Sequence, residues 1–257
     1  MHLLILHASA RTNGNTRRIT DRYITALGKE IGSGFTSETV LVSDASLGTC
    51  KGCRLCFDKG ASYCPHKDNL NRIVNSMQKA DLVIFASPVY VEDVSGTMKT
   101  FLDRCAYFCH RPAFFGKRAF IVTTSGSGST NHTIRTMKNA ASAWGFSVIG
   151  SAKYKTGAWM SDSDMAQSYD DEIAKQVSAI AKKVGKPAVP SLYSLISFRI
   201  IKRIYSKRPD EQNLDYIYWY ERGWLTPSAK YYIPCRIPLY KRLIAGVAST
   251  VLGRVCG

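Results

Sequence analysis

The chain has 257 residues, 45% of them hydrophobic, which is enough for one large α/β domain with a full core and an appendage. Its formal charge of +16 indicates an anionic cofactor, an acidic partner, nucleic acid or an anionic membrane surface, and does not choose among them. We find no stretch of the length of a membrane-spanning helix and no secretory-signal layout at residues 1–16. We therefore expect a cytoplasmic protein.

Hydrophobic periodicity predicts five strands that alternate with five helices along residues 2–184. The predicted strands are 2–7, 35–42, 81–86, 117–124 and 146–154. The predicted helices are 17–29, 69–79, 95–108, 130–143 and 165–184, with Asp68 as the N-cap of the second. Five βα units in series predict an α/β fold with a doubly wound, five-stranded parallel sheet.

Two segments fall outside this alternation. Residues 44–67 form a polar, cysteine-rich insertion after the second strand, and residues 185–190 have the composition of a linker. The sequence therefore predicts a ligand-binding domain at 1–186, with the insertion at 44–67. A helical C-terminal extension is predicted at 187–257.

The loop after the first strand has the features of an anion site. A strand that turns sharply into a helix presents unpaired N–H groups and the positive end of the helix dipole. Gly14 allows a close backbone approach. The side chains that can hydrogen-bond an anion here are Ser9, Arg11, Asn13, Asn15 and Thr16. We predict phosphate binding; an ordinary βα turn is the alternative.

Two further loops follow apolar strands at the same predicted edge of the sheet. One is Ser87-Pro88-Val89-Tyr90, and the other is residues 123–128, which include Thr124, Ser125, Gly126 and Gly128. Ligands of open α/β sheets bind beyond the carboxyl ends of the strands. Both loops are rich in backbone donors and small side chains. Together the three loops suit a flat polar heterocycle that carries a phosphate, although each alone is also compatible with a simple turn.

The insertion contains a compact set of cysteines. Its four members are Cys50, Cys53, Cys56 and Cys64. Two consecutive two-residue spacings, and a proline directly after Cys64, are similar to the ligand pattern of ferredoxins, whereas structural zinc sites more often use two separated pairs. We predict a 4Fe-4S cluster, which Lys51 and Arg54 would help to neutralise. A thiol-rich loop or a redox disulfide is the alternative. Cys105 and Cys109 are expected to be ordinary helix thiols.

Three segments resemble a known family. They are Ser9-Ala-Arg-Thr-Asn-Gly-Asn-Thr16, Ala86-Ser-Pro-Val-Tyr90 and Gly96-Thr-Met-Lys-Thr-Phe-Leu-Asp-Arg104. Over about residues 1–180 the chain resembles the NADPH-dependent FMN reductase family of flavodoxin-like proteins, and most of all its iron–sulfur flavoprotein branch. The resemblance implies that the first loop holds the FMN phosphate. It also implies that residues 87–90 border the ribityl chain and the isoalloxazine, with Thr124, Ser125 and Gly126 at the far edge of the ring.

The same resemblance implies an FMN-dependent oxidoreductase with NAD(P)H as donor and a 4Fe-4S cluster. Its electron donors and acceptors would be small molecules or redox proteins. Flavin can bridge two-electron and one-electron transfer, so no acid or base is required for the hydride step. No catalytic residue is assigned, and Tyr90 is expected to lie beside the ring. The alternative is a non-enzymatic electron carrier or redox sensor that a ferredoxin-like partner reduces. We expect the cluster on the same sheet edge as the flavin, and a homo-oligomer.

The tail from residue 191 onward is basic and aromatic. It contains eleven Lys or Arg residues and four acidic residues. Two helical stretches have apolar faces, the second formed by Leu239, Leu243, Val247 and Val251. One interpretation is an extension that packs on its own domain or across a dimer. The other is peripheral docking on an anionic membrane. Nucleic acid is not expected, because no recognised binding motif accompanies the basic residues.

Overall fold

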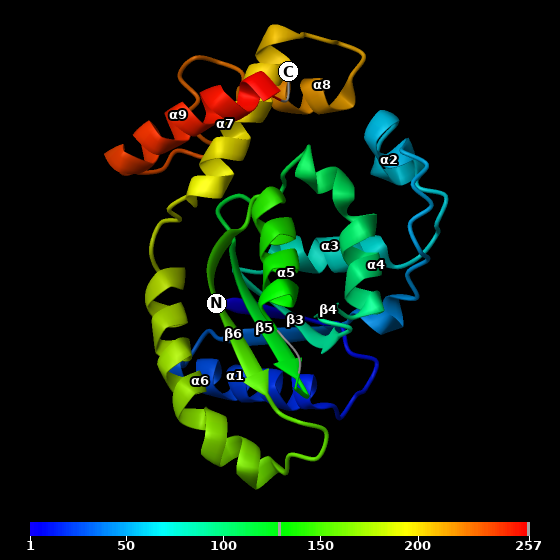
Figure 1. Ribbon diagram of the computed structural model, residues 1–257, viewed down its shortest axis with the longest axis vertical. Helices are drawn as coiled ribbons and strands as arrows, with labels where there is room; N and C mark the ends of the chain where they lie inside the picture. The colour runs from blue at the N-terminus through cyan, green and yellow to red at the C-terminus, as the bar shows by residue number, and fades with distance from the viewer. Residues whose placement is uncertain (128–129, 256–257) are drawn as a thin grey trace.

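A computed structural model of the protein describes residues 1–127 and 130–255, the last three through their backbone alone. Gly128, which belongs to the third predicted loop, lies outside the described residues. The predicted doubly wound sheet is confirmed, with parallel strands in the order β2-β1-β3-β5-β6 (Figure 1). The strands are β1 (His2–His7), β2 (Thr36–Leu41), β3 (Leu82–Tyr90), β5 (Arg118–Ser125) and β6 (Ser147–Lys155).

One short strand was missed. β4 (Asp93–Val94) pairs antiparallel with the end of β3, with Val89 opposite Val94. The predicted loop at 87–90 is therefore the last part of β3. Val91 and Glu92 form the hairpin turn at φ 48° and 64°. Both values lie in the left-handed region that a tight hairpin of this kind requires. Val and Glu are not typical of such turns, so the sequence does not predict one here.

Helices cover both faces of the sheet (Figure 1). On one face, α1 (Asn15–Ile31) and α6 (Asp162–Val184) pack against β1, β3 and β5 through residues such as Tyr23 and Ile173. The other face carries α3 (Leu70–Lys79), α4 (Gly96–Arg104) and α5 (Asn131–Ala143). Their core includes Phe85, Phe101 and Trp144. Burial on both faces explains why the central strands are continuously apolar.

The cysteine-rich insertion has little regular structure. It contains the short helices η1 (Val42–Ala45), α2 (Leu55–Asp58) and η2 (Ala61–Tyr63), and η3 (Ala106–Cys109) follows α4. The N-cap of α3 is Asn69, one residue later than predicted. Asp68 still accepts a hydrogen bond from the Leu70 N–H at 3.3 Å. Its carboxylate is mainly engaged elsewhere, in the contact with Arg104 described below.

The tail forms three helices at one end of the molecule: α7 (Leu192–Lys207), α8 (Leu214–Glu221) and α9 (Leu239–Val255) (Figure 1). They have a core of their own, which we call the aromatic cluster; its buried members are Phe198, Trp219, Trp224 and Tyr232. Phe115 of the body packs against this cluster. In the part of the chain that the structure describes, no helix is long and apolar enough to cross a bilayer.

We expect Trp219→Ala to lower the free energy of unfolding by about 3–5 kcal/mol, because it removes a large side chain from a filled core. Trp219 is fully buried, and its indole N–H donates to the His110 carbonyl at 2.8 Å. Tyr220→Ala is the matched control, since Tyr220 is 66% exposed, and its effect should stay within about 0.5 kcal/mol. Urea denaturation followed by far-UV circular dichroism measures both. Equal effects would show that the aromatic cluster does not stabilise the tail.

Candidate functional site

The first loop is a tight turn between β1 and α1. The Ser9 hydroxyl accepts a hydrogen bond from the Arg11 N–H at 3.2 Å, and the Gly14 N–H donates to the Arg11 carbonyl at 3.3 Å. A Cβ at Gly14 would lie 3.0 Å from the Cβ of Arg11, so a larger residue would open the turn. Ser9 is buried, whereas Arg11 and Asn13 are exposed. The loop is thus closed on its inner side and presents Arg11 and Asn13 to solvent.

The N-terminus of α1 is left open by the protein. Its N-cap is Gly14, which has no side chain to cap the helix, and its first turn, described in full, contains no acid. A side-chain cap is also missing from α3 and α5, whereas α4, α6, α7 and α8 each begin with a Ser or Asn side chain that accepts from the backbone. The N–H groups of Asn15, Thr16 and Arg17 have no acceptor within the helix. They form the kind of donor set, with the helix dipole behind it, that binds phosphate.

Two predicted side chains join this loop to other parts of the sheet edge. The Asn15 amide donates to Thr156 Oγ1 at 3.0 Å and to the Gly157 carbonyl at 2.7 Å. Its side chain therefore holds the loop in place, and its backbone N–H is the group that remains for an anion. The hydroxyl of Thr16 hydrogen-bonds that of Thr124 at 2.7 Å. This bond brings the first and third predicted loops together, as the sequence predicts.

The second predicted segment lies beside the first. The Ser87 hydroxyl accepts from the Ser95 N–H at 3.0 Å, and the Ser95 hydroxyl donates to the Ala8 carbonyl at 2.6 Å. Pro88 and Val89 are half-buried, and the Tyr90 side chain is 49% exposed. Thr124 and Ser125 are buried, and Gly126 is exposed. The three segments thus meet at the carboxyl edge of the sheet, with the polar groups of the strand ends largely buried.

Sequence reasoning missed His7, the last residue of β1. Its side chain is fully buried directly before the first loop. Burial, and then the charge of Arg17, lower the pKa of His7, so the imidazole is neutral at pH 7. A histidine at the end of an apolar strand was the available signal.

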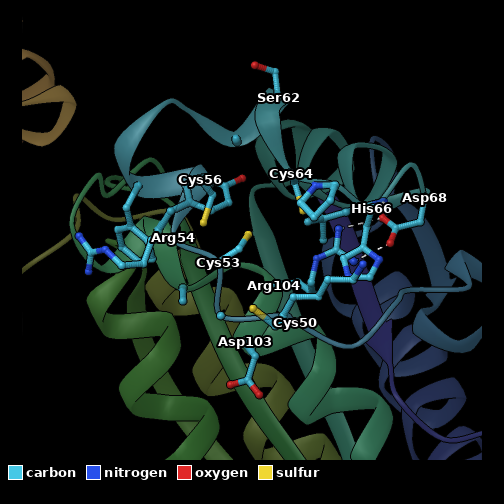
Figure 2. Close-up of a pocket in the computed structure, with 18 of the residues that line it drawn as sticks. Cys50, Cys53, Arg54, Cys56, Ser62, Cys64, His66, Asp68, Asp103 and Arg104 are labelled. Atoms are coloured by element: carbon cyan, nitrogen blue, oxygen red, sulfur yellow. Dashed lines mark hydrogen bonds and ion pairs between the residues drawn. The ribbon is translucent and has the colours of Figure 1, made fainter.

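The four predicted cysteines line one cavity of about 210 Å³. Figure 2 shows their sulfur atoms turned toward one another across it. Cys50 and Cys53 are exposed, and Cys56 and Cys64 are half-buried; Cys105 lies outside the described wall of the cavity. Among the described residues, no three His, Cys, Asp or Glu side chains are close enough to hold a single metal ion. Four thiols spread around one space instead match the ligand number of a 4Fe-4S cluster, whose irons bind one cysteine each.

The cavity makes several thiolates unfavourable together. Burial raises the pKa of Cys56, and the neighbouring thiols of Cys50, Cys64 and Cys53 raise it further. Mutual repulsion of this kind disappears when a cationic centre binds the sulfurs. Arg104 also lines the cavity. Lys51, Arg54 and Lys67 line the cavity as well, so positive charge lies beside the four thiols.

A buried ion pair that sequence reasoning missed lies in the wall of this cavity. Arg104 binds Asp68 through two hydrogen bonds of 2.5 and 3.1 Å (Figure 2), and it also donates to the Gly48 carbonyl at 2.9 Å. The side chains are 2% and 10% exposed. Burial alone would raise the pKa of Asp68, but the hydrogen bonds from Arg104 and from the Gly48 N–H outweigh it and lower that pKa. We call residues 48–68 the cysteine segment. Both of its ends are thereby fixed to α4.

Close packing reinforces this closure. The His66 ring lies against Gly48, where an added Cβ would be 2.3 Å from Nδ1, and His66 Nε2 is 2.8 Å from the Thr49 carbonyl. Arg54 begins α2 with φ 62°, which reverses the chain between Cys53 and Cys56. A side chain at position 48 would therefore displace His66 and the end of the segment that carries it.

The cysteine segment is also tied to the tail. The Arg111 guanidinium donates to the carbonyls of Cys56 and Phe57, and it lies 3.3 Å from the Asp215 carboxylate of α8. The His110 ring makes a second contact with Asp215 at 2.7 Å. One carboxylate of the tail therefore binds Arg111, which holds this side of the cysteine segment, and His110, whose ring packs against Phe57.

Helix α4 separates the two candidate sites. At its start, Ser95 bonds the Ala8 carbonyl beside the first loop; at its end, Arg104 lines the cysteine cavity. Nine helical residues span about 13 Å. The cysteines lie toward the end of α4, on the side where α2 contacts α8 (Figure 1). The insertion leaves the sheet at the carboxyl end of β2, which η1 follows directly, so the expected proximity of the cluster to the flavin stays a prediction.

Comparison with known proteins finds a flavin reductase family and iron–sulfur flavoproteins. The family model described as NADPH-dependent FMN reductase matches residues 1–160. An iron–sulfur flavoprotein of Archaeoglobus fulgidus is 30% identical over 225 residues, which cover 84% of this chain and 96% of that protein. An iron–sulfur flavoprotein of Clostridioides difficile is 26% identical and covers 87% of this chain and 99% of its own. The two relatives match over more than the 180 residues for which we predicted the resemblance, whereas the family model ends at residue 160.

A solved structure shares the fold. RosB with a bound riboflavin-phosphate intermediate superimposes with a TM-score of 0.56 at 15% identity, covering 93% of this chain and 92% of that one. At this identity the likeness concerns the fold alone.

We expect Asp68→Asn to lower the free energy of unfolding by about 3 kcal/mol at pH 7, because it leaves the buried Arg104 charge without its counter-charge. Since the folded pKa of Asp68 is lowered, the difference should be complete above pH 3.8 and should shrink as the pH falls through the folded pKa. Urea denaturation at several pH values measures it. Asp21→Asn, in an exposed pair with Arg17, is the control and should cost less than about 1 kcal/mol. Equal costs would contradict a structural role for the buried pair.

Proposed function

The chain belongs to the NADPH-dependent FMN reductase family, and from this premise we propose that it is an FMN-dependent NAD(P)H oxidoreductase of the iron–sulfur flavoprotein type. The uncapped N-terminus of α1 is the observation that carries the proposal. A helix that leaves its first N–H groups open, after a loop closed on its inner side, is suited to a phosphate monoester such as that of FMN.

The chain's own residues would bind and orient the flavin. The N–H groups of Asn15 and Thr16 would donate to the phosphate, and the Arg11 guanidinium would add a charged fork from solvent. The Thr16–Thr124 bond fixes the distance between the phosphate loop and the segment at the far edge of the ring. Tyr90, half exposed on the β3–β4 hairpin, would border the ring and leave a face open to nicotinamide. FMN bound there would accept a hydride and release electrons singly.

We propose that the cysteine cavity holds a 4Fe-4S cluster, ligated by Cys50, Cys53, Cys56 and Cys64. Its support is the convergence of four thiols on one cavity, together with the iron–sulfur flavoproteins among the relatives. Such a cluster would exchange single electrons. Lys51 and Lys67, which line the cavity, would offset the negative charge of the ligated sulfurs, and the Arg104–Asp68 pair would hold the loop at a fixed geometry around the cluster.

An anaerobic assay tests the proposed activity. Protein purified without oxygen and loaded with FMN should oxidise NADH or NADPH, with bleaching of the flavin absorption followed by reduction of an artificial one-electron acceptor. If neither nucleotide reduces the bound flavin while a reduced ferredoxin does, the protein is an electron carrier and the enzymatic proposal is wrong.

Arg11→Ala should weaken FMN binding by roughly ten- to a hundredfold, because a charge-assisted hydrogen bond contributes about 1.5–3 kcal/mol. Arg135→Ala removes another exposed arginine, on α5, and should leave FMN affinity unchanged. Flavin fluorescence quenching measures both dissociation constants. If the two variants bind FMN equally well and with wild-type affinity, Arg11 does not contact the phosphate.

Replacing Cys53 by Ser should abolish the cluster while FMN stays bound, because the two sites share no lining residue and lie at opposite ends of α4. The readouts are iron and sulfide content after anaerobic reconstitution, expected at about four of each per wild-type chain, and the broad visible absorption of the cluster. Cys109→Ala is the matched control, since Cys109 lies close in sequence to the cavity wall without belonging to it. Iron-free wild-type protein with normal flavin turnover would leave an FMN reductase with a thiol-rich loop.

A further inference from the structure

The large apolar side chains of α9, the last described helix, lie on its solvent-exposed face. α9 contacts α7, and the residues it buries there are small: Ala245 is 1% and Ser249 is 8% exposed. Its large apolar side chains point outward, with Leu243 63% and Val247 69% exposed. The full exposed set is Leu239, Tyr240, Leu243, Ile244, Val247, Val251 and Leu252. An apolar patch of this size on one helix marks an interaction surface.

A basic cavity lies directly beside this patch. It has a volume of about 310 Å³ and its wall contains five cationic residues: Arg199, Lys202, Arg203, Lys230 and Arg242. Its described lining includes no acidic residue. Lys202 donates to the carbonyls of Thr226 and Ala229 at 2.5 and 2.8 Å, so it is held in the wall. Burial, and then the charges of Lys230 and Arg199, lower the pKa of Lys202.

The cavity and the apolar patch are continuous. A second groove of about 580 Å³ is lined by Arg199 and Arg242 on one side and by Leu243, Val247 and Val251 on the other. Arg199 also donates to the Arg242 carbonyl at 3.1 Å, which fixes α7 against α9 at this point. The surface therefore pairs clustered positive charge with protruding aliphatic side chains within one helix length.

The combination of clustered positive charge and exposed aliphatic side chains favours one kind of binding partner. A second copy of the chain docked through α9 would set the basic cavity of one molecule near that of the other, which like-charge repulsion disfavours. An acidic protein would satisfy the cations but would not require a row of exposed Leu, Ile and Val side chains. An anionic lipid surface satisfies both, because phosphates bind the cations while the aliphatic side chains enter the acyl boundary.

We propose that the α7–α9 face docks on anionic phospholipid membranes, with lipid phosphates at the basic cavity and the exposed aliphatic side chains of α9 inserted at the interface. This site lies in the tail and is independent of the proposed redox chemistry.

Vesicle co-sedimentation of the full chain tests the proposal. The protein should bind vesicles of equal parts phosphatidylcholine and phosphatidylglycerol, and should not bind phosphatidylcholine alone. Binding should weaken strongly in about 1 M NaCl, where the screening length falls to about 3 Å. Equal binding to both vesicle types, or to neither, would overturn the proposal.

Two sets of variants separate the lipid contacts from general charge. Arg203→Gln with Arg242→Gln should lower partitioning about thirtyfold, and Val247→Glu should lower it about tenfold or more. The matched controls are Lys175→Gln with Lys182→Gln, two exposed lysines of α6, and Val189→Glu in the linker; both should bind as the wild type does. Circular dichroism and thermal melting establish that all variants are folded. Equal losses in variants and controls would mean attraction by net charge alone and would overturn the assigned face.

Two further outcomes would also overturn it. Inorganic phosphate could bind the cavity, seen as a shift in melting temperature that Arg203→Gln with Arg242→Gln removes, while vesicles do not bind; the site would then take soluble anions. Alternatively, sedimentation velocity could show a dimer that Val247→Glu converts to a monomer, again without vesicle binding. In that case a second copy covers the patch.

Discussion

The buried ion pair between Arg104 and Asp68 holds the cysteine segment to the α/β body. Hydrophobic burial contributes less, because α2 and η2, both fully described, contain no fully buried residue, and Cys56 and Phe57 pack on the core while only partly buried. Removing two charges from water is costly, and the pair offsets that cost with two direct hydrogen bonds and a third to the Gly48 carbonyl. Arg111 adds a second polar anchor at the Cys56 carbonyl. The geometry of the four thiols therefore depends on a few hydrogen bonds from two arginines.

Helix α4 transmits this constraint to the rest of the molecule. Its N-cap, Ser95, is bonded to Ala8 beside the first loop, and its last residue, Arg104, supports the cysteine cavity. The following turn carries Arg111, whose contact with Asp215 continues the connection into α8. A rigid helix with a polar anchor at each end keeps the two candidate redox sites at a fixed separation, and it ties both to the tail.

The features that sequence reasoning predicted are those encoded locally. The parallel sheet follows from strand and helix periodicity, and the cysteine set follows from spacing within fifteen residues. The missed features join distant residues: Asp68 and Arg104 are 36 positions apart, and Asn15 and Thr156 are 141 apart. Asn15 is an example. Its amide could bind a phosphate, but in the structure it donates to Thr156 and Gly157 instead. The turn at Val91 was missed because a β-branched residue rarely adopts a positive φ.

The tail shows how the same composition can serve two environments. Its aromatic side chains, among them Phe198 and Trp219, fill the aromatic cluster, so α7 and α8 are stabilised without help from the aliphatic residues of α9. The apolar face that the sequence predicts for α9 is present. However, the helix packs through Ala245 and Ser249, and its larger apolar side chains are exposed to solvent. Because α8 carries both Trp219 and Asp215, a surface docked through α7 and α9 would be connected by rigid contacts to the cysteine cavity. Docking would then fix the orientation of that cavity relative to the membrane, and so decide which electron-transfer partners could reach it.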